Sequence, residues 1–151
     1  QAALALLAEV ETGLLEADTV TYNAAISAAE KGGHWQTAVA LFDAMVAGRV
    51  ATDPITYNAA ISACEKGGEW RRALDLFAMM ETAQIEKTSV TCGAALCACS
   101  EGNKWRSALG VLDVMRTGVA QTSAIACCTA IGACSKVGQW TDALRLDAFI
   151  V

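Results

Sequence analysis

The sequence has 151 residues, and a hydrophobic content of 54% is enough to build a sizeable core, which argues against a disordered chain. Aromatic residues make up only 6% of the chain and proline occurs once, so closely packed helices are favoured over a β-sandwich and we expect an all-α fold. The formal net charge of -5, from 11 basic and 16 acidic residues, excludes an overall basic field for nucleic acid, and no uninterrupted apolar stretch is long enough to span a membrane.

An internal period runs through the whole chain. Tyr22 recurs as Tyr57, 35 positions later, and residues 19–53 are identical to residues 54–88 at 17 of 35 positions without a gap. The tryptophans keep the same spacing, at Trp35, Trp70, Trp105 and Trp140. A fixed period of this length is typical of architectures that stack one small structural unit repeatedly.

The first unit predicts two amphipathic helices. The first helix is expected over residues 20–31, with a buried stripe formed by Tyr22, Ala25, Ile26 and Ala29. The second begins at Trp35, after which apolar residues follow at helical spacing. Gly32 and Gly33 separate the helices, because glycine accepts the positive φ that a helix C-terminus commonly needs. A loop over residues 48–53 then leads into the next unit.

The later units follow the same plan, so we expect a single array. It comprises the second helix of a partial unit (1–18), three complete units (19–53, 54–88 and 89–123) and a truncated unit (124–151). Two short helices cannot bury their apolar faces alone, so each hairpin should stack on its neighbour. We therefore predict an α-solenoid, a right-handed superhelix of antiparallel helix-turn-helix repeats with a concave inner face.

A second stripe on the first helix of each unit is left over after the apolar face is buried. In the first unit it runs through Val20, Asn23, Ser27 and the pair Glu30 and Lys31, whose spacing places them on one side of the helix. Its members in the following units are Ile55, Asn58 and Ser62, then Val90, Gly93 and Cys97, then Ile125, Cys128 and Gly132. The polarity of this stripe fades toward the C-terminus.

The motifs of the unit identify a resemblance. Thr-Tyr-Asn-Ala-Ala-Ile-Ser-Ala at 21–28, Glu-Lys-Gly-Gly at 30–33 and the Trp-x-x-Ala that follows resemble the pentatricopeptide repeat, over essentially the entire chain. Tetratricopeptide repeats have a period of about 34 residues and a different signature in the first helix. The resemblance implies a module that binds single-stranded RNA along the concave face, with one nucleotide per unit. In that family the residue after the tyrosine reads the base together with the last residue of the unit.

Carried over by this resemblance, the base-reading pairs are Asn23 with Asp53, Asn58 with Thr88, and Gly93 with Ser123, while Cys128 of the truncated unit has no partner. The first pair is the one that the family uses for uridine, and the second is expected to favour a pyrimidine less sharply. An asparagine amide offers both a donor and an acceptor to the Watson–Crick edge of a pyrimidine, and a nearby carboxylate can fix its orientation. Glycine and cysteine are poor readers, so the specificity of the third and fourth units is weaker.

The resemblance also assigns roles to the flanking positions. The aliphatic residue at the start of each first helix is implied to pack against a base, which selects Val20, Ile55, Val90 and Ile125. A lysine ends three of the first helices, so Lys31, Lys66 and Lys136 are candidate phosphate contacts. The alternative is structural, because the helix dipole favours a cation at this end whatever its partner.

The other chemistry-bearing residues predict structure rather than catalysis. Each tryptophan heads the apolar stripe of a second helix, so we expect core packing rather than base stacking. Five of the seven cysteines recur at the unit spacing, and none has the spacing of a zinc site. His34, the only histidine, lies in a turn with no nucleophile or carboxylate cluster beside it. We expect no metal, no cofactor and no enzymatic activity.

Two functions remain open from the sequence. The first is sequence-selective binding of single-stranded RNA in organellar RNA processing, editing, stability or translation, alongside other proteins of an RNA-processing complex. The second is a protein-interaction scaffold whose groove holds a peptide, which the net charge of -5 favours. We expect a monomer without membrane association, in a mitochondrion or chloroplast. Because the chain does not begin with methionine, its targeting segment is expected to lie outside this sequence.

Overall fold

The computed structural model describes residues 5, 8, 9, 18–117, 124–136 and 138. In that part of the chain it contains no strand, and the helices are α2 (Thr19–Lys31), α3 (Trp35–Ala47), α4 (Pro54–Lys66), α5 (Trp70–Thr82), α6 (Ser89–Glu101), α7 (Trp105–Thr117) and α8 (Ala124–Lys136). None of these helices is long and apolar enough to cross a bilayer. The chain is an all-α repeat solenoid, which confirms the predicted fold class. The expected helix within residues 1–18 and the end of the truncated unit lie largely outside the described residues.

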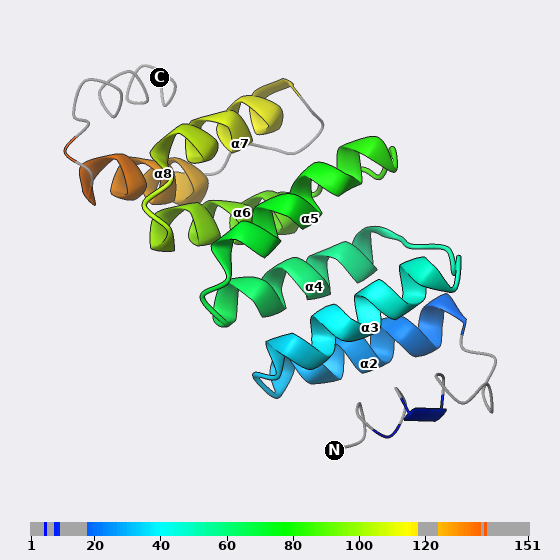
Figure 1. The fold of residues 1–151 in the computed structure, drawn as a ribbon. Coiled ribbons are helices and arrows are strands. Elements are labelled where there is room, and N and C mark those ends of the chain that lie inside the picture. Colours follow the sequence, from blue (N-terminus) through cyan, green and yellow to red (C-terminus); the bar gives the residue numbers. More distant parts are fainter. Residues whose placement is uncertain (1–4, 6–7, 10–17, 118–123, 137, 139–151) are drawn as a thin grey trace.

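The helices form two layers, shown in Figure 1. The first helices of successive units (α2, α4, α6 and α8) pack side by side, and each second helix packs on the first helix of its own unit and on that of the next. Within the described ranges, consecutive second helices do not pack backbone against backbone. The layer of first helices is therefore the tighter one. A stack curves toward its tighter side, so the first helices line the concave face.

Each of the first three first helices begins with a side-chain cap. The carboxylate of Asp18 accepts the Thr21 N–H at 2.9 Å, and that of Asp53 accepts the Thr56 N–H at 2.8 Å. Thr88 caps α6 in the same way through its hydroxyl. Such a cap satisfies a backbone donor that the helix leaves unpaired and contributes about 1 kcal/mol. The residue that closes one unit is thus the one that starts the next helix.

The two turn positions inside each unit have different backbone conformations. Gly33 and Gly68 adopt a φ of 73°, and Asn103 adopts 53° at the matching place. The residue before each of them, such as Gly102 with a φ of -77°, has an ordinary right-handed conformation. The positive φ expected of the glycine pair is thus found at its second residue.

At Gly67 and Gly102, the first position of the turn lies against a tryptophan of the preceding unit. A Cβ atom on Gly102 would lie 2.5 Å from Cγ of Trp70, and a Cβ atom on Gly67 would overlap the ring of Trp35. Lys104 Nζ also lies 4.6 Å from the Trp70 ring centroid. Trp35, Trp70 and Trp105 are half-buried, and the rings of Trp35 and Trp70 lie at the junctions between units, against Gly67 and Gly102. Trp140 lies outside the described residues.

A continuous core connects the layers across units. Phe42 of α3 meets Tyr57 of α4 edge to face, with ring centroids 5.0 Å apart. Small thiols fill tight places in this core, among them Cys64 and Cys99, which are fully buried. Burial raises the pKa of Cys64 to about 11 and that of Cys99 to about 12, so both remain protonated thiols at neutral pH.

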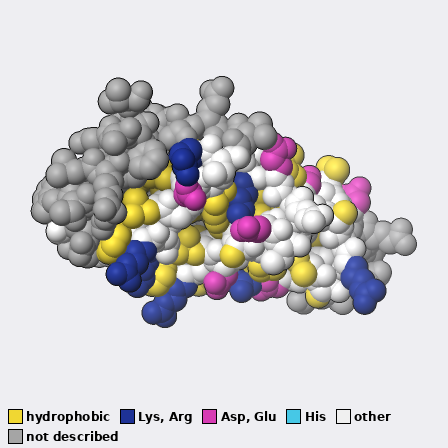
Figure 2. Space-filling model, turned by 90° about the horizontal axis from the view of Figure 1, so that it is seen from above, with side chains coloured by type: hydrophobic (Ala, Val, Ile, Leu, Met, Phe, Trp, Pro, Cys, Tyr) yellow, Lys and Arg dark blue, Asp and Glu magenta, His cyan; other side chains and the backbone are white. Residues whose placement is uncertain are grey.

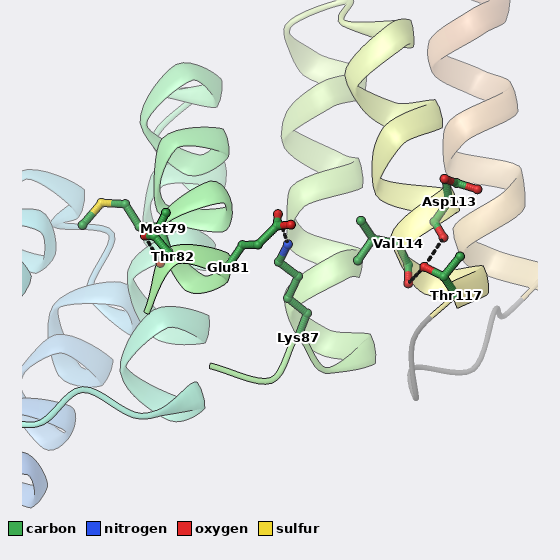
Figure 3. A network of polar contacts seen from close by, with 7 residues as sticks. All are labelled: Met79, Glu81, Thr82, Lys87, Asp113, Val114 and Thr117. Atoms are coloured by element: carbon green, nitrogen blue, oxygen red, sulfur yellow. Dashed lines mark hydrogen bonds and ion pairs between the residues drawn. The ribbon is translucent and has the colours of Figure 1, made fainter. Parts of the chain in front are cut away.

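Threonine hydroxyls donate hydrogen bonds to backbone carbonyls at the C-terminal ends of α5 and α7, as Figure 3 shows. The Thr82 hydroxyl donates to the Met79 carbonyl at 2.9 Å, and the Thr117 hydroxyl donates to the Asp113 carbonyl at 3.0 Å. In the loop after α5, Lys87 pairs with Glu81 at 3.2 Å, and its ammonium group lies 4.5 Å from the centroid of the Phe77 ring. These contacts fix the loop that delivers Thr88 to the start of α6.

Candidate functional site

An aliphatic residue stands exposed at the start of α2, α4 and α6. The exposed fraction of the side chain is 73% for Val20, 61% for Ile55 and 65% for Val90, which makes them the three most exposed large apolar residues among those described. A single exposed aliphatic residue needs no explanation, but a row at one unit spacing on the concave layer does. The side chain of Ile125 lies outside the described residues.

Asn23 is held at the junction between the first and second units. Its amide nitrogen donates to both oxygens of Asp53, at 3.1 and 3.2 Å. Its amide oxygen accepts from the Thr56 hydroxyl at 2.6 Å. The side chain is half-buried, and these contacts come from the last residue of its own unit and the third residue of the next. The predicted pair of Asn23 and Asp53 therefore lies in direct contact.

The Asp53 carboxylate is kept ionised by this arrangement. Partial burial alone would raise the pKa of Asp53, but the Thr56 N–H and the Asn23 amide donate to the carboxylate, and the Thr56 hydroxyl oxygen lies 2.8 Å from Oδ1. These hydrogen bonds outweigh burial and hold the pKa of Asp53 below its ordinary value. An ionised carboxylate only accepts hydrogen bonds, so the Asn23 amide must turn its nitrogen toward Asp53.

Asn58 occupies the same place at the next junction with weaker partners. Its amide nitrogen lies 3.4 Å from the Thr88 hydroxyl oxygen, and its amide oxygen accepts from the Thr91 hydroxyl. The Thr88 and Thr91 hydroxyl oxygens are 2.9 Å apart, and either of them can be the donor. The second predicted pair is thus also in contact, but no charged group fixes its polarity.

The third and fourth units lack this arrangement in the described residues. A Cβ atom on Gly93 would meet nothing within 4 Å, so the position of a reading side chain is open there. Ser123, its predicted partner, lies outside the described residues. Cys128 on α8 is exposed.

Farther along the concave layer, a glutamate crosses the first junction. Glu30 accepts from the Ser62 hydroxyl at 3.2 Å and forms an ion pair with Lys66. This bond raises the pKa of Lys66, so the ammonium group stays charged. Lys66, a candidate phosphate contact, is thus shared with a carboxylate. Lys31, at the matching place on α2, is exposed.

The junction between α4 and α6 carries negative charge. Glu101 stands where the other first helices end in lysine. Burial and the negative charge of Glu101 raise the pKa of Glu65, and burial together with both carboxylates raises the pKa of Cys97. At the third junction a cation returns, because Lys136 Nζ donates to the Ser100 hydroxyl oxygen at 3.2 Å. Glu101 therefore interrupts the row of lysines that end the other first helices, and Glu65 lies beside it.

Charged side chains are interspersed over the face drawn in Figure 2. In that view, basic side chains near the top and centre have acidic side chains close by, whereas two basic groups lie together at the lower left and one stands apart at the right edge. The ion pair between Arg72 of α5 and Asp43 of α3, 2.5 Å long, likewise joins two units by pairing a cation with a carboxylate of the same chain. The part of the chain that the structure describes holds no group of three or more His, Cys, Asp or Glu side chains that could bind a metal ion.

Two residues of the site were missed by reasoning from the sequence. Thr56 and Thr91 are completely buried, and their hydroxyls touch the asparagine of the preceding unit. The signal was present, because a threonine precedes the tyrosine or its replacement at the unit spacing in Thr21, Thr56 and Thr91. Periodicity alone cannot show that this hydroxyl reaches back across a junction.

Comparisons with known proteins agree with this geometry. A model of the PPR repeat family matches residues 17–66, and a model of the PPR repeat matches residues 55–85. No curated protein sequence matches the chain.

Solved structures share the fold at low identity. The pentatricopeptide repeat protein PPR10 from maize is 24% identical with a TM-score of 0.71, over 86% of this chain and 19% of that one. PPR10 in complex with an 18-nt psaJ RNA element is 22% identical with a TM-score of 0.70, over 95% and 22%. The PPR domain of Arabidopsis thaliana protein-only RNase P 1 in complex with tRNA is 14% identical with a TM-score of 0.81, over 95% and 76%. The chain spans about a fifth of the length of PPR10.

The repeat matches, the helical hairpins and the junction geometry lead to the same assignment. The 35-residue period carries the motifs of the unit through the sequence, and the described helices stack as the solved relatives do. Residues 17–85 match models of the pentatricopeptide repeat, and the chain is similar to pentatricopeptide repeat proteins in its fold.

Proposed function

We propose that this array binds single-stranded RNA along its concave layer, with one nucleotide per unit and the best-defined base contacts at the first two units. The proposal extends to a role in RNA processing, editing, stability or translation in a mitochondrion or chloroplast, as the family resemblance implies. The asparagine network at each of the first two junctions carries it.

The Asn23 amide keeps hydrogen-bonding groups that the network does not use. One amide N–H shared between the two oxygens of Asp53 accounts for both contacts there, and one lone pair of the amide oxygen is used on Thr56, so this arrangement keeps one donor and one acceptor for a base. A pyrimidine Watson–Crick edge needs such a pair. Val20 and Ile55 expose apolar surface on the same layer, where a base can stack. This combination supports base reading better than it supports a purely structural role.

Binding is tested by fluorescence anisotropy with labelled oligouridine, oligocytidine and oligoadenosine at low and moderate salt. We expect oligouridine to bind most tightly, and all affinities to fall as salt rises because phosphate contacts release counterions. Equal weak binding to all three RNAs at every salt concentration would contradict base reading.

The acidic junction gives a prediction about phosphate contact. Glu101→Lys restores the cation that the other first helices carry and removes the repulsion of Glu65. We expect a tighter complex with every RNA and a salt slope steeper by about 0.7, the value for one added phosphate contact on a single strand. Anisotropy titrations over a series of salt concentrations measure both quantities.

The matched control for this variant is Glu86→Lys, which makes the same charge change at an exposed position in the loop before α6. If both variants tighten binding equally, the gain comes from net charge, and the row of first-helix ends is not a phosphate path.

The acidic junction also favours one rival function. A groove with Glu65 and Glu101 at its centre suits a cationic peptide, which would use the array as a protein-interaction scaffold. Absence of RNA binding at low salt, together with capture of a basic peptide that Glu101→Lys abolishes, would favour the scaffold.

A further inference from the structure

Thr56 belongs to the second unit but contacts the base-reading residue of the first. Its hydroxyl oxygen lies 2.6 Å from the Asn23 amide oxygen and 2.8 Å from Asp53 Oδ1, and its side chain is 0% exposed. Asp53 Oδ1 already accepts the Thr56 N–H and the Asn23 amide. The single hydroxyl proton is therefore most useful on the Asn23 oxygen, which has no other donor among the described residues.

The two partners of Asn23 differ in what they can offer. The Asp53 carboxylate can only accept and binds the amide nitrogen, whereas the Thr56 hydroxyl lies within hydrogen-bonding distance of both the amide oxygen and Asp53 Oδ1. Rotating the amide by half a turn would set its oxygen against the carboxylate, and the Thr56 hydroxyl proton would have to turn from the amide oxygen to Asp53. Asp53 therefore selects one orientation of Asn23, and the Thr56 hydroxyl stabilises that orientation through the amide oxygen.

Orientation decides which pyrimidine an amide accepts. Uracil presents a carbonyl oxygen beside an N–H, while cytosine presents an amino group beside an unprotonated ring nitrogen. The order of donor and acceptor is reversed between the two edges, so an amide that suits one must turn over to suit the other. An amide held in one orientation discriminates between them, and a reversible amide does not.

Asn58 supplies the contrast within the same chain. Its two partners, Thr88 and Thr91, are both hydroxyls, and each can donate or accept. The reversed Asn58 amide would find a donor at Thr88 and an acceptor at Thr91 after the two hydroxyl protons rotate. The second unit therefore lacks the fixed polarity of the first.

We infer that Thr56 is a positioning residue for Asn23, so that the preference of the first unit for uracil over cytosine depends on the third residue of the following unit. This inference rests on the proposed RNA binding. It makes the junction, rather than the single unit, the element that sets base specificity.

The test compares Thr56→Val with the rescue variant Thr56→Ser in the complete chain. Valine keeps the shape and the backbone N–H that Asp53 caps but removes the hydroxyl, whereas serine restores it. Affinities for labelled oligouridine and oligocytidine give a ratio that a loss of folded protein leaves unchanged, because unfolding lowers both affinities equally. We expect Thr56→Val to lower the uridine-to-cytidine ratio by about fivefold, as for the loss of one neutral hydrogen bond, and Thr56→Ser to restore most of it.

A matched control is available at Thr21, whose hydroxyl bonds to Asp18 at 2.8 Å as Thr56 bonds to Asp53. Within the described residues the Thr21 hydroxyl bonds to Asp18 and to no asparagine. Thr21→Val should therefore leave the ratio at the wild-type value.

A second measurement needs no RNA. The side-chain amide signals of Asn23 in a proton–nitrogen NMR spectrum, assigned by their loss in Asn23→Ala, should move in Thr56→Val and return toward their wild-type positions in Thr56→Ser. Unmoved signals, or a wild-type ratio in Thr56→Val while the wild-type chain prefers oligouridine, would overturn the inference alone. A wild-type chain that binds neither RNA would overturn the proposed function, and the specificity role with it.

Discussion

Gly102→Ala is expected to lower the free energy of unfolding by about 2 kcal/mol, because the added methyl group would lie 2.5 Å from Cγ of Trp70 and force the ring out of its junction. Trp70→Ala should cost about 3 kcal/mol by removing the ring that seals that junction. Chemical denaturation followed by circular dichroism measures both values.

The double variant provides the stronger test. With Trp70 truncated, Gly102→Ala meets no ring, and its φ of -77° is ordinary for alanine, so the change should be neutral or stabilising by about 0.5 kcal/mol. Gly32→Ala is the control, because the nearest side chain to its Cβ atom is that of exposed His34, at 3.1 Å. Strictly additive losses in the double variant would show that the glycine is not needed for the tryptophan. RNA affinity of Trp70→Ala should fall only in proportion to unfolding; a folded variant that no longer binds would make Trp70 a base platform.

Asn23→Thr is expected to move the preference of the first unit from uracil toward guanine, as the threonine–aspartate pairing of the family implies. Discrimination by one base-edge contact is worth about 1 to 3 kcal/mol, or about tenfold for each 1.4 kcal/mol. The measurement uses oligouridines in which a single guanosine is moved along the sequence. One of these RNAs should bind the variant at least about tenfold better, relative to oligouridine, than it binds the wild-type chain.

Gln36→Thr is a suitable control for this prediction, because Gln36 is exposed on α3 in the outer layer. It should leave the profile of base preference unchanged. If Asn23→Thr binds RNA with the wild-type profile, the reading role of this position does not hold in this chain.

Much of the fold was accessible from periodicity. The stripe through Tyr22 and Ile26 placed the first helix within one residue of its observed start, and the glycine turn marked its end. The division of roles within the glycine pair was not accessible. Local patterns show that glycine permits a positive φ, but only the packed structure shows that Gly67 and Gly102 make room for a ring from the preceding unit.

The positions of the site residues were predictable from the sequence, but the hydrogen bonds between units were not. Unit spacing selected Asn23 and Asp53, and the structure brings them within hydrogen-bonding distance. The buried hydroxyl of Thr56 completes this network from the next unit, and contacts between units depend on how the helices stack rather than on the pattern inside one unit. The same reason explains why the sequence suggested a phosphate contact for Lys66 and did not reveal its ion pair with Glu30.

The aspartate that closes the first unit also starts the second, since Asp53 caps α4 while it holds Asn23. Its replacements during evolution must therefore satisfy a folding requirement before any RNA requirement. Asp, Asn and Ser cap helices about equally well and Thr somewhat less, whereas aliphatic residues cap poorly. Exchange among these few polar residues changes the hydrogen-bonding character offered to the reading asparagine at little cost in stability. Few residue types are thus allowed at this position. Exchange among them can change the base that a unit prefers without a compensating stabilisation elsewhere in the protein.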